Sequence, residues 1–358
     1  MPNLKFSQFS AQTDPANVQF LVGYNGTANV RIAPGDLGGG GASSLNGLSD
    51  VLIDTASEYV GTVPAGLSGN PQNNTTLGIS AGLDLTTGTR NTLIGNLAGE
   101  NVIGQFGTTA VGYKAGSSQN AESYNTYIGN EAGRDHVGSQ SVFIGGSTRV
   151  YSSGQNSNGV VTVGYGAHDQ KAGSFSVAVG YAAGAQASGV QSVYVGRDAG
   201  KTNVTTGMVA VGYEALRANV GGNGQVAVGY RAGYTNTSGS WNVNMGYFAA
   251  YTNSTGGENT VIGTEAGYNN TGSSNTFLGY QAGYDQTTGS NNIVIGHDAE
   301  PSAVGASNEI TLGDANITAL RIPGLQSGAS DGDVLTFSSG TGLITLQAAG
   351  GGGSSYPF

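Results

Sequence analysis

The chain has 358 residues, of which only 9% are charged and 64 are glycine, whereas ordinary globular domains carry about 25% charged residues and about 7% glycine. Its net charge of −10, from 12 basic and 22 acidic residues, argues against nucleic acid or an anionic membrane surface as the main partner. The 37% of hydrophobic residues and the 18 tyrosines argue against a disordered chain, and the absence of cysteine excludes disulfides and thiolate metal sites.

Residues 1–36 differ in pattern from the rest of the chain. The sequence VQFLVGYNGTANVRIAP alternates on both sides of Asn25-Gly26, which predicts a β-hairpin with a two-residue type I′ turn. The start lacks a basic segment followed by an apolar one, and no later segment approaches about 18 apolar residues, so neither an export signal nor a membrane span is predicted.

Residues 37–72 are expected to connect the hairpin to the main body. GDLGGGGASS, from Gly35 to Ser44, has the composition of a flexible linker. LSDVLIDTASEYVGTVPAGLSGNPQ follows and predicts short strands that lead into the next segment.

An internal repeat fills residues 73–316. It is marked by a glycine that follows an apolar residue, and the steps between successive glycines are 16 or 17 residues in all cases but one, which is 19. The fifteen anchor glycines are Gly78, Gly95, Gly112, Gly129, Gly145, Gly164, Gly180, Gly196, Gly212, Gly229, Gly246, Gly263, Gly279, Gly296 and Gly313. So regular a period indicates a repeat architecture.

The residues around each anchor glycine predict a strand followed by a tight corner. The residue before the glycine is always apolar and the residue two places earlier is mostly β-branched, while the residue between them varies freely. This period of two, with one fixed and one free face, is typical of a half-buried strand. The third residue after the glycine is alanine in thirteen of the fifteen units, which predicts a close approach of backbones.

Each unit is therefore predicted to form one coil of a β-solenoid, with identical positions stacked at about 4.8 Å per coil. A three-faced hexapeptide helix needs another apolar residue six places on, where the chain has Glu100, Ser117 or Arg134. One thin coil buries too little apolar surface to offset the ordering of its backbone. The sequence thus predicts that several chains, most naturally three, join their fixed faces around one axis.

Residues 317–358 form the C-terminal segment. DGDVLTFSSGTGLITLQ, from Asp331 to Gln347, reads as a second hairpin, and AAGGGGSSYPF is a glycine-rich tail.

The repeats resemble those of two protein families. NTVIGTEAG, QSVYVGRDAG and GSFSVAVGYAAGAQASG resemble the repeats of trimeric autotransporter adhesin heads, which form a left-handed parallel β-roll. GYQAGYDQTTGSNN and NEITLGDANITALRIPG are similar to segments of bacteriophage tail fibres. The resemblance covers roughly residues 73 to 324.

The resemblance implies a homotrimeric structural fibre of a virion, without enzymatic activity or a cofactor. Its N-terminal region would bind other virion proteins or cap the solenoid, and the fibre would bind a host-surface glycan or protein. The alternatives are a bacterial trimeric surface adhesin and a fibre depolymerase. The adhesins carry an export signal, a coiled-coil stalk and a membrane anchor, and many such phage fibres carry a C-terminal chaperone domain; none of these patterns is recognisable here.

Two sets of polar residues are candidates for a metal site or a catalytic site. His136, His168 and His297 each adjoin an aspartate but belong to different coils, so no three-ligand metal site is predicted and the histidines are expected at the surface or in turns. Among the acidic residues two places after an anchor glycine, Asp198 and Glu214 lie in consecutive coils at the spacing of a glycosidase pair. Because Lys114 and Arg231 occupy the same ladder position, a solvated row of charges is favoured.

Aromatic residues are the remaining candidates for binding. Tyrosine recurs one and five places after the anchor glycine, which predicts ladders that pack between chains or, alternatively, stack on sugars. Trp241, the only tryptophan, lies in a predicted loop and is the candidate for contact with a receptor.

Overall fold

A computed structural model describes residues 57–61, 64–68, 71–117, 123–148, 157–170 and 173–321 in full. It also describes the backbones of five strands: β1 (Leu21–Tyr24), β2 (Asn29–Ile32), β3 (Val51–Asp54), β20 (Val334–Phe337) and β21 (Ile344–Gln347). Among these described residues every regular element is a β-strand. The chain divides into two units, Met1–Leu312 and Gly313–Phe358.

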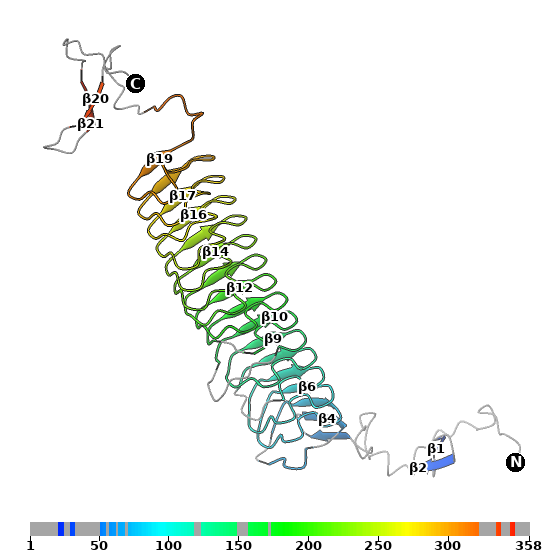
Figure 1. The fold of residues 1–358 in the computed structure, drawn as a ribbon. Coiled ribbons are helices and arrows are strands. Elements are labelled where there is room, and N and C mark those ends of the chain that lie inside the picture. The colour runs from blue at the N-terminus through cyan, green and yellow to red at the C-terminus, as the bar shows by residue number, and fades with distance from the viewer. Residues whose placement is uncertain are drawn as a thin grey trace, which may run out of the picture. The chain divides into compact units, whose positions relative to one another are not determined.

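The first unit contains a parallel β-solenoid (Figure 1). Strand β4 (Ser57–Gly61) pairs antiparallel with β3 and parallel with β5, and each strand from β5 to β18 pairs parallel with the next. The pairing is in register from coil to coil, as in Val177↔Val193 and Val193↔Val209. The fifteen strands are β5 (Thr75–Gly78), β6 (Thr92–Ile94), β7 (Thr109–Val111), β8 (Thr126–Ile128), β9 (Val142–Ile144), β10 (Val161–Val163), β11 (Val177–Val179), β12 (Val193–Val195), β13 (Val209–Val211), β14 (Val226–Val228), β15 (Val243–Met245), β16 (Thr260–Ile262), β17 (Thr276–Leu278), β18 (Ile293–Ile295) and β19 (Ile310–Leu312). The predicted all-β solenoid of about fifteen coils is confirmed.

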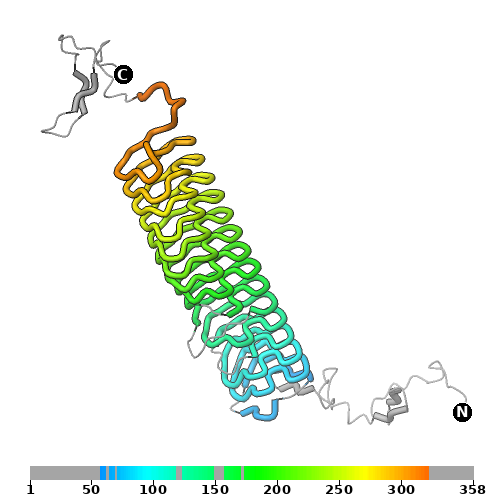
Figure 2. The backbone as a smooth tube through the Cα atoms, viewed as in Figure 1, coloured from blue at the N-terminus to red at the C-terminus, as the bar shows by residue number. Residues whose placement is uncertain are grey.

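The anchor glycine is required at the corners from Gly78 to Gly279 for two reasons. Gly95 has φ 129°, a backbone conformation that L-residues with a side chain rarely adopt. A Cβ atom on Gly95 would also lie 2.6 Å from the carbonyl oxygen of Gly112 in the next coil. The corners stack with little variation along the solenoid, as the backbone trace in Figure 2 shows. A side chain at this position would therefore push two neighbouring coils apart.

The middle residue of each three-residue strand from β6 to β18 fills the interior of its own coil, whereas Thr311 of the last strand, β19, is half-buried. The structure thus corrects the assignment of faces, because the variable residue was expected on the free face. Alternate residues point to opposite sides of a strand, so the two fixed apolar residues point outward. The buried middle residues, all 0% exposed, are Leu93, Ala110, Tyr127, Phe143, Thr162, Ala178, Tyr194, Ala210, Ala227, Asn244, Val261, Phe277 and Val294.

The middle residue can vary in size because the residue four places after the anchor varies in the opposite sense. Beside the ring of Phe277, the fourth residue after the anchor is Gly267 or Gly283, and a Cβ on either would come within 2.7 Å of that ring. Beside the small Ala210 and Ala227, the fourth residue is instead Leu216, which is fully buried. Large and small side chains thus interdigitate between the two positions, as close packing requires.

The alanine three places after the anchor is buried in every described coil that has it, and Thr148, which replaces it once, is buried as well. The residues that follow the alanine bond to the next coil: the amide of Gly99 donates to the carbonyl oxygen of Ala115 at 2.8 Å. The predicted close approach at this position is confirmed.

Buried asparagines form a ladder that the sequence reading did not identify. Four residues before the anchor, Asn91 accepts a hydrogen bond from the amide of Thr108 (2.9 Å) and donates to the carbonyl oxygen of Gln105 (2.9 Å). Asn259 does the same with Asn275 and Gly272, both at 2.9 Å. Each side chain thus satisfies buried backbone groups of its own and a neighbouring coil. The signal in the sequence is the Asn that precedes the strand in seven of the fifteen coils.

The short terminal strands form the predicted hairpins. Strands β1 and β2 pair antiparallel with Tyr24 opposite Asn29; the predicted turn at Asn25-Gly26 lies outside the described residues. In the second unit, β20 and β21 pair antiparallel with Phe337 opposite Ile344. The linker from Gly35 to Ser44 and the tail after Gln347 lie outside the described residues.

Candidate functional surfaces

Two columns of apolar side chains line the outside of the strand face. We call them the outward columns: they consist of the first and third residues of the three-residue strands β6 to β19, together with Thr75 and Leu77 of β5. Every member is Thr, Val, Ile, Leu or Met, so neither column carries a charge over these fifteen strands. Ile144, Met245 and Leu278 are 38%, 40% and 43% exposed although each has a stacked neighbour. The single chain therefore leaves a long, uncharged, apolar surface in water.

The tyrosine ladders stack within one chain. In the first ladder the ring centroids of Tyr213 and Tyr230 are 5.0 Å apart, and those of Tyr230 and Tyr247 are 5.1 Å apart. In the second, Tyr251 and Tyr268 are 5.2 Å apart. The faces of the inner rings are thus covered by neighbouring rings, which leaves their edges and hydroxyl groups for other contacts. Stacking of sugars on these inner faces, one of the two interpretations considered above, is not compatible with this geometry.

Phe248 joins the two ladders. Its ring meets Tyr247 edge-on at 4.5 Å and Tyr251 at 4.9 Å. Edge-to-face and offset-stacked contacts of this kind each contribute about 0.5–1.5 kcal/mol beyond burial. The joined ladders therefore stabilise the stacking of the coils at the solenoid surface.

The candidate carboxylates Asp198 and Glu214 are both engaged by cations. Asp198 accepts from Lys201 at 2.7 Å and lies 3.4 Å from Arg197. Glu214 accepts from Arg231 at 2.6 Å and lies 3.6 Å from Arg217. The carboxylate side chains are only 7% and 10% exposed. The expected solvated row is therefore wrong at these coils, because stacking covers the charges and each carboxylate pairs with cations of its own or an adjacent coil.

These ion pairs do not favour the interpretation of Asp198 and Glu214 as a glycosidase pair. A glycosidase needs one protonated carboxyl that donates to the glycosidic oxygen. The hydrogen bond from Arg231 to Glu214 raises the pKa of the Arg231 guanidinium, and in this pair the Glu214 carboxylate acts as the acceptor. The two carboxylates thus hold arginine and lysine side chains in place rather than facing one open groove as a free pair.

Two of the three histidines are in the interior. His168 lies in a turn, as expected, although it is buried, whereas the expectation is wrong for His136, which lies neither at the surface nor in a turn. His136 and His168 are 0% exposed, while the side chain of His297 is 69% exposed. The Tyr127 hydroxyl donates to Nδ1 of His136 (2.8 Å), and Nε2 of His136 donates to the carbonyl oxygen of Ser157 (2.8 Å). Burial lowers the pKa of His136 to about 4, so the ring is neutral near pH 7.

His168 occupies the position that is glycine in most coils, four residues after the anchor. Its Nδ1 lies 3.0 Å from the Thr162 hydroxyl, and its Nε2 is buried without a hydrogen-bond partner. Burial lowers the pKa of His168 to about 4 as well. The histidine fills the space left by the small strand residue Thr162, as Leu216 does in another coil. Among the residues described in full, no three His, Cys, Asp or Glu side chains are grouped so that they could hold a metal ion.

Trp241 lies on the surface, as predicted, with 65% of its area exposed. Its ring covers Gly224 of the preceding coil, where a Cβ atom would collide with it. Tyr124 covers Gly107 and Phe175 covers Gly159 at the same ladder position. Beside Trp241 is an open cavity of about 300 Å³ lined by Ser240, Thr255, Gly257, Glu258 and Ser273. Packing over Gly224 explains the position of the Trp241 ring. Contact of Trp241 with a receptor stays a prediction.

No helix in the described part of the chain is long and apolar enough to cross a membrane. No protein-family model matches this chain, and no curated protein and no solved structure matches it either.

Proposed function

We propose that this protein is a non-enzymatic structural protein whose β-solenoid forms the shaft of a homotrimeric fibre. The fibre belongs to a bacteriophage virion as a tail fibre or another external appendage, and it contributes to attachment to the host surface. The N-terminal region binds other virion proteins, and the partner on the host is a surface glycan or protein. The phage assignment is supported by the resemblance of the repeats to tail-fibre sequences; the assembly is supported by the outward columns.

The outward columns are the observation that carries the proposed assembly. At about 4.8 Å per strand, fifteen strands extend the apolar surface over about 70 Å. Soluble monomers rarely expose apolar patches of more than a few hundred Å², and larger patches mark sites of association. Because both columns are free of charge throughout, the surface is suited to burial along its whole length.

A second and third copy of the same chain are the occupants that fit this surface best. The columns repeat once per coil and in register, so a copy with the same repeat meets the same pair of side chains at every step. Symmetric association of identical chains is the usual form of soluble oligomers. The number three comes from the resemblance to trimeric fibres.

The test compares two double variants by sedimentation. The wild-type protein should sediment at about three times the 35.8 kDa chain mass. Val195→Lys with Val211→Lys places two charges in an outward column and should yield monomers, because two buried unpaired charges per chain are too costly to retain. Val204 and Val220, 44% and 51% exposed, lie in the same two coils outside the columns. The matched control, Val204→Lys with Val220→Lys, should remain trimeric.

A monomeric wild-type protein would contradict the proposed assembly. So would equal loss of the trimer in both double variants, because that result would show a general sensitivity to charge. Labelling of intact particles with an antibody to this chain tests the proposed location on the virion.

A further inference from the structure

The middle of the solenoid carries positive charge on an acidic chain. From Gly173 to Gly257 the charged residues are four cations and two anions: Arg197, Lys201, Arg217 and Arg231 against Asp198 and Glu214. These coils thus have a surplus of two positive charges, whereas the whole chain has a net charge of −10. We call these six residues, together with Tyr213 and Tyr234, the Arg–Tyr patch.

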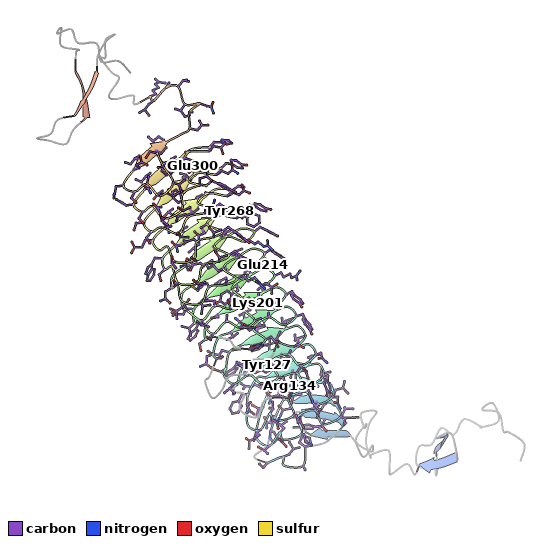
Figure 3. All side chains as sticks on the ribbon, viewed as in Figure 1. Tyr127, Arg134, Lys201, Glu214, Tyr268 and Glu300 are labelled. Carbon is purple, nitrogen blue, oxygen red and sulfur yellow. The ribbon has the colours of Figure 1, made fainter. Side chains whose placement is uncertain are left out.

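The members of the patch form one connected surface. The guanidinium of Arg197 lies 5.6 Å from the ring of Tyr213, and that of Arg231 lies 5.8 Å from the same ring. Arg231 also lies 5.3 Å from the ring of Tyr234, whose hydroxyl accepts a hydrogen bond from Arg217 at 2.9 Å. Figure 3 shows Lys201 and Glu214 one above the other on adjacent coils. The cations are held in place by rings and carboxylates rather than scattered over the solenoid.

Hydrogen-bond donors exceed acceptors in this patch. Each guanidinium carries five N–H donors and each carboxylate two oxygens. Both oxygens of Asp198 lie against cations, and both oxygens of Glu214 do so as well. The side chains of Arg197 and Arg217 remain 58% and 37% exposed. Their remaining donors can bind an anionic group from outside, which guanidinium groups recognise with two parallel hydrogen bonds.

A cavity beside the patch gives such a group a place to bind. Its volume is about 410 Å³, and it is lined by Gln186, Lys201, Thr202, Arg217, Ala218 and Val220. The lining combines two cations with an amide, a hydroxyl and apolar carbon. These groups suit a sugar ring that bears an acidic substituent, because its hydroxyls, its charge and its C–H faces would each have a partner.

We infer that the Arg–Tyr patch and its cavity bind an acidic polysaccharide through carboxylate or phosphate groups. The inference deepens the proposed attachment role, on which it rests for its biological setting. Nucleic acid is less suited to this surface, because the bases would need free aromatic faces and the tyrosine faces here are largely covered by neighbouring rings and guanidinium groups.

The experiment measures binding of the full-length protein to immobilised polygalacturonate, whose acidic groups are carboxylates, and to phosphate-bearing lipopolysaccharide. Dextran serves as the neutral probe and a single-stranded DNA oligonucleotide as the nucleic-acid probe. Lys201→Gln with Arg217→Gln should weaken binding to the acidic glycan at least about tenfold, since hydrogen bonds to charged groups typically contribute that much each. Binding should also fall steeply as salt is raised.

The matched control is Arg90→Gln with Lys114→Gln, which removes two cations outside the patch and should leave binding unchanged. Arg197→Gln, at the most exposed cation, should give a smaller loss and provides a second test if the double variant folds poorly. Preference for one acidic glycan over the other identifies the acidic group. No binding to either, equal loss in the control, equal binding of dextran, or binding of DNA alone would overturn the inference. Sedimentation of the same samples reports the trimer separately, so failure of one proposal does not imply failure of the other.

Discussion

The interior of the solenoid differs between its N-terminal coils, up to Thr148, and its C-terminal coils, from Ala199 onward. Seven residues after the anchor glycine, the N-terminal coils bury Leu85, Val102 and His136, whereas the C-terminal coils bury a run of amides. That run is Asn203, Asn219, Asn236, Asn253, Asn270 and Gln286. The backbone corners are nevertheless the same in both regions. One coil shape can therefore be filled either by apolar packing or by hydrogen bonds to the loop that follows.

Four of the six amides bond to their own loops, namely Asn203, Asn219, Asn253 and Asn270, whereas Gln286 bonds to Gly305 and Ala306 of the next coil and the side chain of Asn236 has no hydrogen-bond partner. Asn253 donates to the carbonyl oxygen of Gly256 (3.0 Å) and accepts from the Gly256 amide (2.8 Å). Asn219 makes the same two bonds with Gly222, at 3.0 and 3.2 Å. The rings of Tyr127 and Phe143 stack at 5.6 Å in the N-terminal coils, and Phe277 is buried in a C-terminal coil as well. The difference between the two regions therefore lies seven places after the anchor, where amides replace apolar and imidazole side chains.

Removal of a ring from the N-terminal coils should have the largest effect on stability. Phe143→Ala leaves a cavity beside Tyr127 and His136 and should lower the free energy of unfolding by about 3–5 kcal/mol. Hydrogen exchange of the neighbouring amides measures the effect locally. In the C-terminal coils, where the middle strand residues at Ala210 and Ala227 are already small, Ala210→Gly removes only one methyl group and should cost far less. Equal losses would show that the two interiors do not differ in the proposed way.

Acid should open the region around His136 and His168 before the C-terminal coils. The folded-state pKa of each ring is lowered to about 4 from about 6.5 in the unfolded chain, so the unfolded state binds more protons between these values. The stability that each neutral ring contributes is complete above about pH 6.5 and is lost as the pH falls toward 4, by roughly 3 kcal/mol per ring. Hydrogen exchange at pH 7 and pH 4.5 measures this loss.

A His168→Leu variant provides the control for the acid experiment. Leucine already occupies the equivalent position at Leu216, so the variant should fold and should lose part of the pH dependence. A pH profile identical to that of the wild type would contradict a role for His168.

Loss of one amide from the C-terminal coils should have the smallest of the three effects. Asn253→Ala leaves the amide and the carbonyl of Gly256 without their side-chain partner and should cost about 1–3 kcal/mol. The reciprocal change, Val102→Asn, buries an amide in a coil built for an apolar residue and should be destabilising as well. Local hydrogen exchange measures both. An unchanged free energy of unfolding in Val102→Asn would show that the two kinds of interior are interchangeable.

Much of the fold could be predicted from the sequence because the features that set it are local and recur in each coil. Stacking brings equivalent residues of successive coils into contact. It therefore imposes the period of 16 or 17 residues, the strand before each anchor glycine and the small residue three places after it. The anchor at Gly95 illustrates this, since its φ and the nearness of Gly112 both exclude a side chain. The asparagine ladder was also visible in the sequence and was missed, because Asn before a strand is common in turns.

The sequence by itself determined the repeat, the strand positions and the existence of two unlike strand faces. Only the tertiary structure decided which face lies inside. Constant apolar residues predict a buried face, yet the variable residues are inside, because Tyr127 or Ala110 can each be accommodated when a neighbouring position changes volume in return. Only the structure likewise placed His136 and His168 in the interior and joined four cations and two tyrosine ladders into one surface. These outcomes depend on contacts between coils, which a period of two along one strand does not specify.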